Sequence, residues 1–462
     1  MTANRTPRPV PNDRELRLWR VGRALAVTFV AAVLVAGGVF YSLVVLLDFQ
    51  QIDTTAKLDA KTLFDLVKLS FGVVAGAGAL VALVVAYRRQ RVDEAGAHRE
   101  ATRLHTERFS QAVDKLGSDS PAVRLGGVHA LAGLADDAPD QSLRQTCIDV
   151  LCAYLQLPFT PDPGYDPAHQ EEHHRYLALR KVRHTILRLI GDHYRRPKGT
   201  HRSWQGCDLD LTGVTIDGDM DFHGATFSDG MVNFRGATFF GGTVNFDGAK
   251  FSGSMVHFDG ATFSDGTVNF RGATFSDGMV SFGGATFSGG IVDFGMATFS
   301  GGRVDFRFAE FSGGMVDFGR TTFSGGTVNF VCAKFFGGTV NFVGAAFSGG
   351  TVHFRDAEFS DGTVHFSDAE FSDGTVHFHN ASFSGGTVNF VGTAFSGGTV
   401  HFSDAEFSDG TVHFHNASFS GGTVNFVGAV HFDTAVGPAP DGLLAAVGTP
   451  PATGVILLPD WL

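Results

Sequence analysis

Two pairs of histidines have a spacing that could hold a metal ion. His377 and His379, and likewise His413 and His415, are two residues apart, so both members of a pair share one face of an extended strand. Imidazole nitrogens are common zinc ligands. Both pairs arose by duplication, because residues 362–392 and 398–428 are identical, and an outward His on a solvated strand needs no ligand. We therefore predict no metal site at either pair.

Acidic residues offer the other candidate chemistry. Asp293, Asp305 and Asp317 recur every 12 residues and could be the carboxylates of a polysaccharide-cleaving site. If four sides close a coil of ~24 residues, only Asp293 and Asp317 stack, and repulsion would perturb their pKa values. No base accompanies them. A second polar cluster stands near a helix start, where we expect solvation rather than metal binding: His169, Glu171, Glu172, His173 and His174.

No nucleotide-binding motif is present, since the Gly-rich text contains neither a Walker A motif nor a strand–GxGxxG–helix context. The sequence therefore predicts no catalytic, cofactor-binding or metal-binding residue and no cofactor. We expect the protein not to be an enzyme.

The element that positions these residues is a long repeat. From Phe222 to Phe426, Phe recurs with alternating spacings of five and seven, and 35 of the 46 Phe lie on this grid. The unit is therefore 12 residues, commonly F-x-G-A-T-F-S-G-G-T-V-N. Such self-similarity indicates a solenoid.

Each unit contains two short apolar pairs, Ala-x-Phe and Val-x-Phe, followed by Gly or small polar residues. This pattern predicts short strands separated by corners, stacked so that each Phe has a Phe above and below it. The position before the Phe of Val-x-Phe should face outward and form polar ladders up two sides: Asn233, Asn245, His257, Asn269, Ser281, Asp293, Asp305, Asp317, Asn329, Asn341, His353, His365, His377, Asn389, His401, His413 and Asn425.

The segments A-T-F-S-G and V-N-F-V-G resemble pentapeptide repeats, which implies a right-handed quadrilateral β-helix. The chain departs from that pattern through a two-residue insertion such as Gly242–Thr243. We expect a coil of ~24 residues and roughly 8 coils at the ~4.8 Å strand spacing. The alternative, a flat meander of hairpins, would expose a large apolar face.

Charge limits the classes of partner that the sequence allows, and cysteine content indicates the cellular compartment. The net charge is −12, and residues 205–462 carry 8 Lys and Arg against 26 Asp and Glu, a net charge of −18. An acidic solenoid does not suit direct nucleic-acid binding. The four Cys form no CxxC pair, which favours reduced thiols in a cytoplasmic setting.

Two uncharged stretches near the N-terminus predict membrane spans. Residues 24–47 and 69–87 contain no charge, and either could cross a core of ~30 Å as a helix. Arg residues flank the pair, so the positive-inside rule puts both termini in the cytoplasm of a multi-pass protein. Two buried core helices are the alternative. Gly72 and Gly76 form a GxxxG motif that could join the helices or make a homo-oligomer; ordinary Gly frequency is the other explanation.

A helical connector follows. Residues 88–116 predict a helical stalk, Ser120 an N-cap and Pro121 the first position of another helix. Residues 173–194 predict a helix with an apolar side and a basic side. Two motifs in this connector, E-R-F-S-Q-A-V-D-K-L-G-S (residues 107–118) and V-R-L-G-G-V-H-A-L (residues 123–131), resemble the juxtamembrane segment of membrane-anchored bacterial pentapeptide-repeat proteins.

These observations define a domain plan. We expect a basic segment at 1–23, a two-span hairpin at 24–91, a cytoplasmic stalk and connector at 92–204, the repeat β-helix at 205–434 and a C-terminal cap at 435–462. The predicted function is a protein-interaction or scaffold module on the cytoplasmic face of a bacterial cell membrane, with an unknown protein partner. The alternative, implied by the resemblance, is a DNA-mimicking protein that binds topoisomerases.

Overall fold

The computed structural model describes residues 60–159, 162–164, 166–264, 266–407, 411–431, 442–447 and 455–456, with scattered positions between 27 and 41. The chain divides into two compact units, residues 1–103 and 104–462. Helix α2 (Ala60–Leu116) begins in the first unit and ends in the second. The predicted span at 24–47 lies almost entirely outside the described residues.

The prediction of two transmembrane helices is wrong for the part that is described. Among the described residues, none of the helices has the combination of length and apolarity that crossing a bilayer requires. The stretch 69–87 lies inside α2, where Gly72, Gly76 and Gly78 add little apolar surface and charged sequence continues the helix on both sides. The predicted location as a multi-pass membrane protein rested on these spans and is therefore wrong as well. The predicted contact through Gly72 and Gly76 stays a prediction; among the described residues, and apart from the adjacent helix backbone, no atom lies within 4 Å of a Cβ built at either glycine.

The second unit begins with the end of α2 and a group of helices. These are α3 (Pro121–Asp136), α4 (Gln141–Gln156), the 3-10 helix η1 (Pro167–His169) and α5 (Gln170–Tyr194). As predicted, Ser120 is the N-cap of α3 and Pro121 opens the helix, although the Ser120 side chain makes no capping bond. Asp140 does cap α4, because its side chain accepts a hydrogen bond from the Leu143 amide at 2.9 Å.

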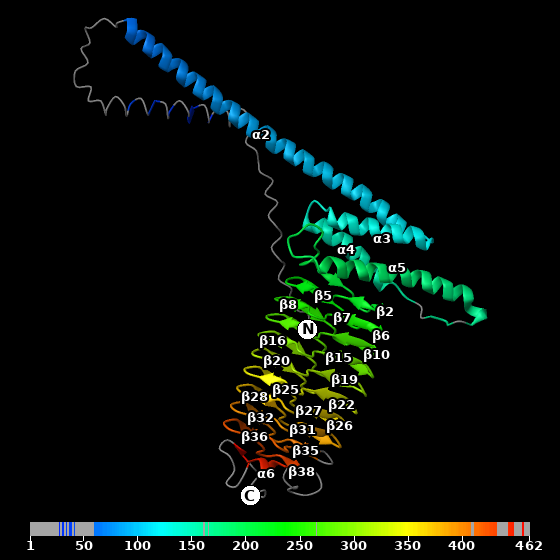
Figure 1. The fold of residues 1–462 in the computed structure, drawn as a ribbon. Helices are drawn as coiled ribbons and strands as arrows, with labels where there is room; N and C mark the ends of the chain where they lie inside the picture. Colours follow the sequence, from blue (N-terminus) through cyan, green and yellow to red (C-terminus); the bar gives the residue numbers. More distant parts are fainter. Residues whose placement is uncertain are drawn as a thin grey trace, which may run out of the picture. The chain divides into compact units, whose positions relative to one another are not determined.

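The rest of this unit is a four-sided solenoid of very short parallel strands (Figure 1). Two sheets, A and B, form successive sides. In the described residues sheet A consists of β1 (Leu209–Asp210), β5 (Met231–Asn233), β9 (Met255–His257), β13 (Met279–Ser281), β17 (Arg303–Asp305), β21 (Thr327–Asn329), β25 (Thr351–His353), β29 (Thr375–His377), β33 (Thr399–His401), β37 (Thr423–Asn425) and β39 (Val455–Ile456). Sheet B consists of β2 (Thr215–Ile216), β6 (Thr238–Phe240), β10 (Thr262–Ser264), β14 (Thr286–Ser288), β18 (Glu310–Phe311), β22 (Lys334–Phe336), β26 (Glu358–Ser360), β30 (Ser382–Ser384), β34 (Glu406–Phe407) and β38 (Val430–His431).

Sheets C and D complete each turn. Within the described part of the chain, sheet C consists of β3 (Met220–Asp221), β7 (Thr243–Asn245), β11 (Thr267–Asn269), β15 (Ile291–Asp293), β19 (Met315–Asp317), β23 (Thr339–Asn341), β27 (Thr363–His365), β31 (Thr387–Asn389) and β35 (Thr411–His413). Sheet D consists of β4 (Thr226–Phe227), β8 (Lys250–Phe251), β12 (Thr274–Phe275), β16 (Thr298–Phe299), β20 (Thr322–Phe323), β24 (Ala346–Phe347), β28 (Glu370–Phe371), β32 (Ala394–Phe395) and β36 (Ser418–Phe419).

The strand register confirms the predicted length of the coil. Val256 pairs with Val280 in sheet A and Phe263 pairs with Phe287 in sheet B. The first coil is one residue shorter, since Leu209 pairs with Val232 and Thr215 with Thr238, whereas Met220 already pairs with Val244. Sheets C and D have nine described strands each, so the solenoid has about nine turns rather than the predicted eight.

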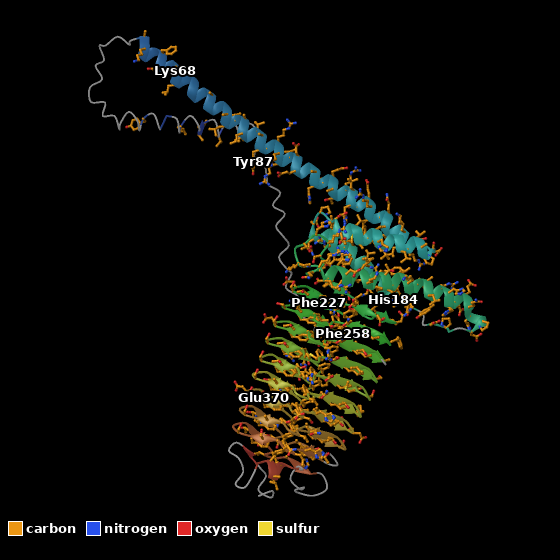
Figure 2. The ribbon with its side chains drawn as sticks, in the orientation of Figure 1. Lys68, Tyr87, His184, Phe227, Phe258 and Glu370 are labelled. Atoms are coloured by element: carbon orange, nitrogen blue, oxygen red, sulfur yellow. The ribbon has the colours of Figure 1, made fainter. Side chains whose placement is uncertain are left out.

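Phe rings fill the interior in columns. The ring of Phe258, which Figure 2 labels, stacks on Phe234 and on Phe282 at 4.9 Å, with interplanar angles of 3° and 6°. Glu370, also labelled, lies outside on sheet D. Close stacking of the coils excludes side chains at some corners: a Cβ on Gly290 would lie 2.6 Å from the Gly266 carbonyl oxygen. The flat meander is thus excluded, because these rings are buried.

The helices cover the first coil. Gln145 of α4 donates to the Asp208 carbonyl at 2.8 Å and accepts from the Asp208 amide at 2.9 Å. Tyr194, the last residue of α5, is buried, and its hydroxyl donates to the Cys207 carbonyl at 2.8 Å. A Cβ on Gly191 would lie 2.1 Å from the Asp221 carbonyl oxygen, so α5 meets the coil backbone directly. The segment predicted as a connector therefore also caps the solenoid.

The other end of the solenoid has a different covering. Strand β39 extends sheet A beyond β37, with Val424 paired to Val455. Helix α6 (Leu443–Val447) contributes Leu443, which is fully buried. Both elements protect an edge that would otherwise expose unpaired backbone groups and the last Phe rings.

Candidate interaction surface

The predicted polar ladders are present on sheets A and C, but four members on sheet A are buried rather than exposed: His257, Ser281, Asp305 and Asn329. Each ladder residue pairs with its counterpart in the next coil, as His353 does with His377 and His377 with His401. The ladders also hold the corners: the Asn329 side-chain oxygen accepts a hydrogen bond from the Val331 amide at 3.0 Å. Asn341 adds a bond between coils by donating to Asp317 at 2.9 Å. These bonds give the outward residues a structural role besides any binding role.

Three histidines form a stack within the ladder of sheet A. The rings of His353 and His377, and of His377 and His401, lie 5.0 Å apart and almost parallel. Burial lowers the pKa of His377 to about 4, with further lowering from His353, His401 and His379. Burial also lowers the pKa values of His353 and His401. At neutral pH the stack is therefore an uncharged polar surface.

Of the two histidine pairs weighed as metal ligands, the first is engaged by other groups, because His377 stacks on its neighbours in the ladder and His379 contacts a backbone carbonyl. The ring nitrogen Nδ1 of His379 lies 3.0 Å from the Ser403 carbonyl oxygen. The rings of His413 and His415 lie 6.2 Å apart. In the described part of the chain, the side chains of His, Cys, Asp and Glu do not gather in a group of three or more that could hold a metal ion.

The three aspartates divide as predicted. Asp293 pairs with Asp317 in sheet C, whereas Asp305 lies in sheet A. Asp305 is 2% exposed and is held by Arg303 at 3.0 Å and by Arg307 at 2.9 Å. Two arginines neutralise the Asp305 carboxylate on sheet A, whereas Asp293 and Asp317 stack on sheet C. The three aspartates therefore do not form a joint acid–base site.

The cluster near the start of α5 is likewise dispersed. His173 is buried, with its Nδ1 atom 2.6 Å from Asp162, and the hydrogen bond holds the pKa of Asp162 below its usual range. Glu171 forms an exposed pair with Arg175 at 3.4 Å. Hydrogen bonding to a neighbouring loop thus accounts for His173, the one buried member of the cluster.

On the described strands of sheets B and D, acidic residues do not form continuous rows at the outward positions. The outward position of sheet B is interrupted by neutral and basic residues, and reads Thr238, Thr262, Thr286, Glu310, Lys334, Glu358, Ser382 and Glu406 along the described strands. The equivalent position of sheet D contains a single acid, Glu370, among Thr, Lys, Ala and Ser in its described strands. Neither of these two outward positions therefore carries an unbroken row of negative charge.

Sequence reasoning missed a polar cluster that joins α5 to the first coil. Asp217 accepts hydrogen bonds from Tyr176 at 2.6 Å and Arg180 at 2.9 Å, and His184 lies 3.3 Å away. Burial alone would raise the pKa of Asp217, but the bonds with His184 and Tyr176 hold it below its usual range. The available signal was the four-residue spacing of Tyr176, Arg180 and His184, which places them on one helix face.

The architecture defines the class of protein as a four-sided parallel β-solenoid. Residues 246–295 match the family model described as pentapeptide repeats (9 copies). The match and the solenoid together support a pentapeptide-repeat protein, a fold that is generally non-catalytic. Neither curated proteins nor solved structures provide a match to the chain.

Proposed function

We propose that the protein is a non-enzymatic repeat protein that binds a protein partner through the outside of its solenoid. The observation that supports this most is the regularity of the ladders, whose members recur in register from coil to coil on sheets A and C. The Phe columns beneath them are fully buried, so the backbone that presents the ladders is stiff. A preorganised surface loses little conformational entropy on binding.

We place the contact on the later coils. Residues 351–410 contain nine Asp and Glu and one Lys or Arg. On the same coils, sheet A presents the half-buried stack of His353, His377 and His401. Acidic residues around a neutral polar centre favour a partner with a basic rim, because opposite charges steer association and suppress wrong partners.

Site-specific cross-linking in the full chain tests this proposal. A photo-reactive residue placed at Thr375 on sheet A is compared with one at Thr243 on sheet C of the early coils. A partner that cross-links at Thr375, and whose affinity then falls at least tenfold in the charge reversal Glu358→Lys, supports the proposal. Equal cross-linking at both positions, or an unchanged affinity of the variant, contradicts it.

DNA mimicry is the second candidate, and the scattered acids disfavour it. A mimic of duplex DNA needs negative charge in continuous rows, whereas Lys334 interrupts the outward position of sheet B. A supercoiling assay with a purified topoisomerase separates the two candidates. We expect no inhibition at protein concentrations that saturate the partner identified by cross-linking.

A further inference from the structure

A pocket of about 490 Å³ lies among the helices that cap the solenoid. Its walls come from the end of α2, from α3, from α4, from the loop after α4 and from α5, and all of them belong to the second unit. Apolar side chains dominate the lining, including Val113, Leu116, Val150 and Leu179. This volume falls within the range of ~300–1,000 Å³ that is usual for small-molecule sites.

Two arginines supply the charged part of the lining. Arg183 is 4% exposed, and its guanidinium lies 4.5 Å above the Phe159 ring. Arg124 is half-buried, and its Nη1 atom lies 3.4 Å from the Tyr154 hydroxyl. Among the described residues, neither arginine has a carboxylate within ion-pair distance. Many other described arginines do have one, among them Arg180, Arg188 and Arg235.

Structural bonds explain where Arg183 lies but leave its charge without a counterion. Its two terminal nitrogens donate to the carbonyls of Leu155 at 2.7 Å and Thr215 at 2.6 Å. Carbonyl oxygens compensate a buried guanidinium only in part, and burial lowers the pKa of Arg183. Asp217 lies near enough to oppose that lowering, but its own bonds go to Tyr176 and Arg180. An anion in the pocket would provide the missing charge.

We propose that this pocket binds an amphipathic carboxylate with an unbranched apolar chain. The carboxylate would lie between Arg183 and Arg124, where a planar guanidinium can donate two parallel hydrogen bonds. The chain would lie along Val113, Leu116, Val150 and Leu179 and remove apolar surface from water. The cap of the solenoid is thus a small-molecule site separate from the ladders.

Calorimetric titration of the full chain with decanoate, below the concentration at which it forms micelles, tests the proposal. We expect saturable binding of one decanoate per chain and at least tenfold weaker binding of 1-decanol, which has the chain without the charge. Absence of saturable binding, or equal affinity for the two compounds, overturns the proposal.

Two variants test the location. Ala153→Trp places a large side chain against an exposed part of the lining, and Arg124→Gln removes one charge. We expect Ala153→Trp to abolish decanoate binding and Arg124→Gln to weaken it at least fivefold. Arg188→Gln is the control, because Arg188 is an exposed arginine of α5 outside the pocket, paired with Asp192. Unchanged affinity in either pocket variant, with circular dichroism showing an intact fold, overturns the proposal.

Discussion

The ring of Tyr194, at the end of α5, lies 5.3 Å from the ring of Phe227, the first Phe in the column beneath sheet D. Phe227 in turn stacks on Phe251 at 5.0 Å. Tyr194 therefore continues the column by one ring and joins the helices to the solenoid. Burial raises the pKa of Tyr194 well above its usual value, so its hydroxyl stays protonated and can donate to Cys207.

Removal of the Tyr194 hydroxyl should loosen the cap. Tyr194→Phe leaves the buried Cys207 carbonyl without its donor, which costs about 1–3 kcal/mol. Because each coil contacts only its neighbours, the loss should speed amide hydrogen exchange in the first coil and leave the coil around Val400 unchanged. Tyr87→Phe is the control, since Tyr87 is 56% exposed and should have no measurable effect. Equal effects of the two substitutions would contradict this role for Tyr194.

Two neighbouring Phe residues should differ sharply on substitution. Phe335 is 1% exposed and stacks on Phe311 and Phe359, whereas Phe336 is 45% exposed and pairs with Ser360. Phe335→Ala should lower the free energy of unfolding by about 3–5 kcal/mol, because it leaves a cavity in the column. Phe336→Ser should change it by less than about 0.5 kcal/mol. Urea unfolding followed by circular dichroism measures both changes. A larger loss for Phe336→Ser than for Phe335→Ala would contradict the placement of Phe335 in the interior.

The interior of the solenoid could be predicted because each inward residue repeats. Ala, Val and Phe at fixed offsets specify which face of each strand points inward. The sum of the spacings five and seven, taken twice, gives the coil length that pairs Val256 with Val280. The division of Asp293, Asp305 and Asp317 between opposite sheets followed from the same arithmetic. The first coil was recognisable as irregular because its apolar residues, such as Leu209 and Ile216, replace Phe.

The helical cap could not be predicted in the same way. Arg183 falls on the basic side of its helix in sequence, yet it is 4% exposed, whereas Leu177 from the predicted apolar side is 43% exposed. The burial of Arg183 depends on contacts with the distant segments that contain Leu155 and Thr215, and no periodic signal encodes those contacts. The prediction of membrane spans was wrong for a related reason. A local absence of charge does not by itself make a helix apolar enough to cross a membrane.

One corner next to sheet A carries a residue with a strained backbone, and a substitution should relieve the strain. Phe308 has a φ of +60°, and the same corner one coil earlier is Gly284, with a φ of +63°. Phe308 is 63% exposed, so little burial is lost when its side chain is removed. Phe308→Gly should therefore stabilise the fold by about 1 kcal/mol.

The reverse substitution tests the same cause. Apart from the adjacent residues, no atom of the described part of the chain lies within 4 Å of a Cβ built on Gly284, so Gly284→Ala should destabilise by about 1 kcal/mol through backbone strain alone. Thermal melts of the two variants should shift in opposite directions. A shift in the same direction would show that φ does not govern this corner.

The histidine stack should make stability depend on pH. Burial and like charges hold the pKa of His377 at about 4, below the ordinary value of 6.5 that applies in the unfolded chain. Between these values the unfolded state binds more protons, so stability is full above about pH 6.5 and falls as the pH drops toward 4. His377→Asn should lessen this loss of stability, because it removes the group that takes up the proton. Asn should fit there, since it is the residue at the same ladder position in β21 and β37.

Melting temperatures between pH 7.5 and 4.5 provide the measurement. Asn389→Ser on sheet C is the control, since it changes a ladder residue without removing a titrating group, and it should keep the wild-type pH dependence. An identical slope for His377→Asn and the wild type would rule out the stack as the source.

The closed four-sided coil is the claim on which the whole account depends, and thiol bridging tests it directly. Thr351 and Thr375 are paired on adjacent strands of sheet A, whereas Thr363, which lies halfway between them in sequence, is on sheet C. In a background with Cys332→Gly, the pair Thr351→Cys and Thr375→Cys should be joined by the short thiol cross-linker dibromobimane. The pair Thr351→Cys and Thr363→Cys should not be joined. Bridging of the second pair instead of the first would contradict the four-sided solenoid.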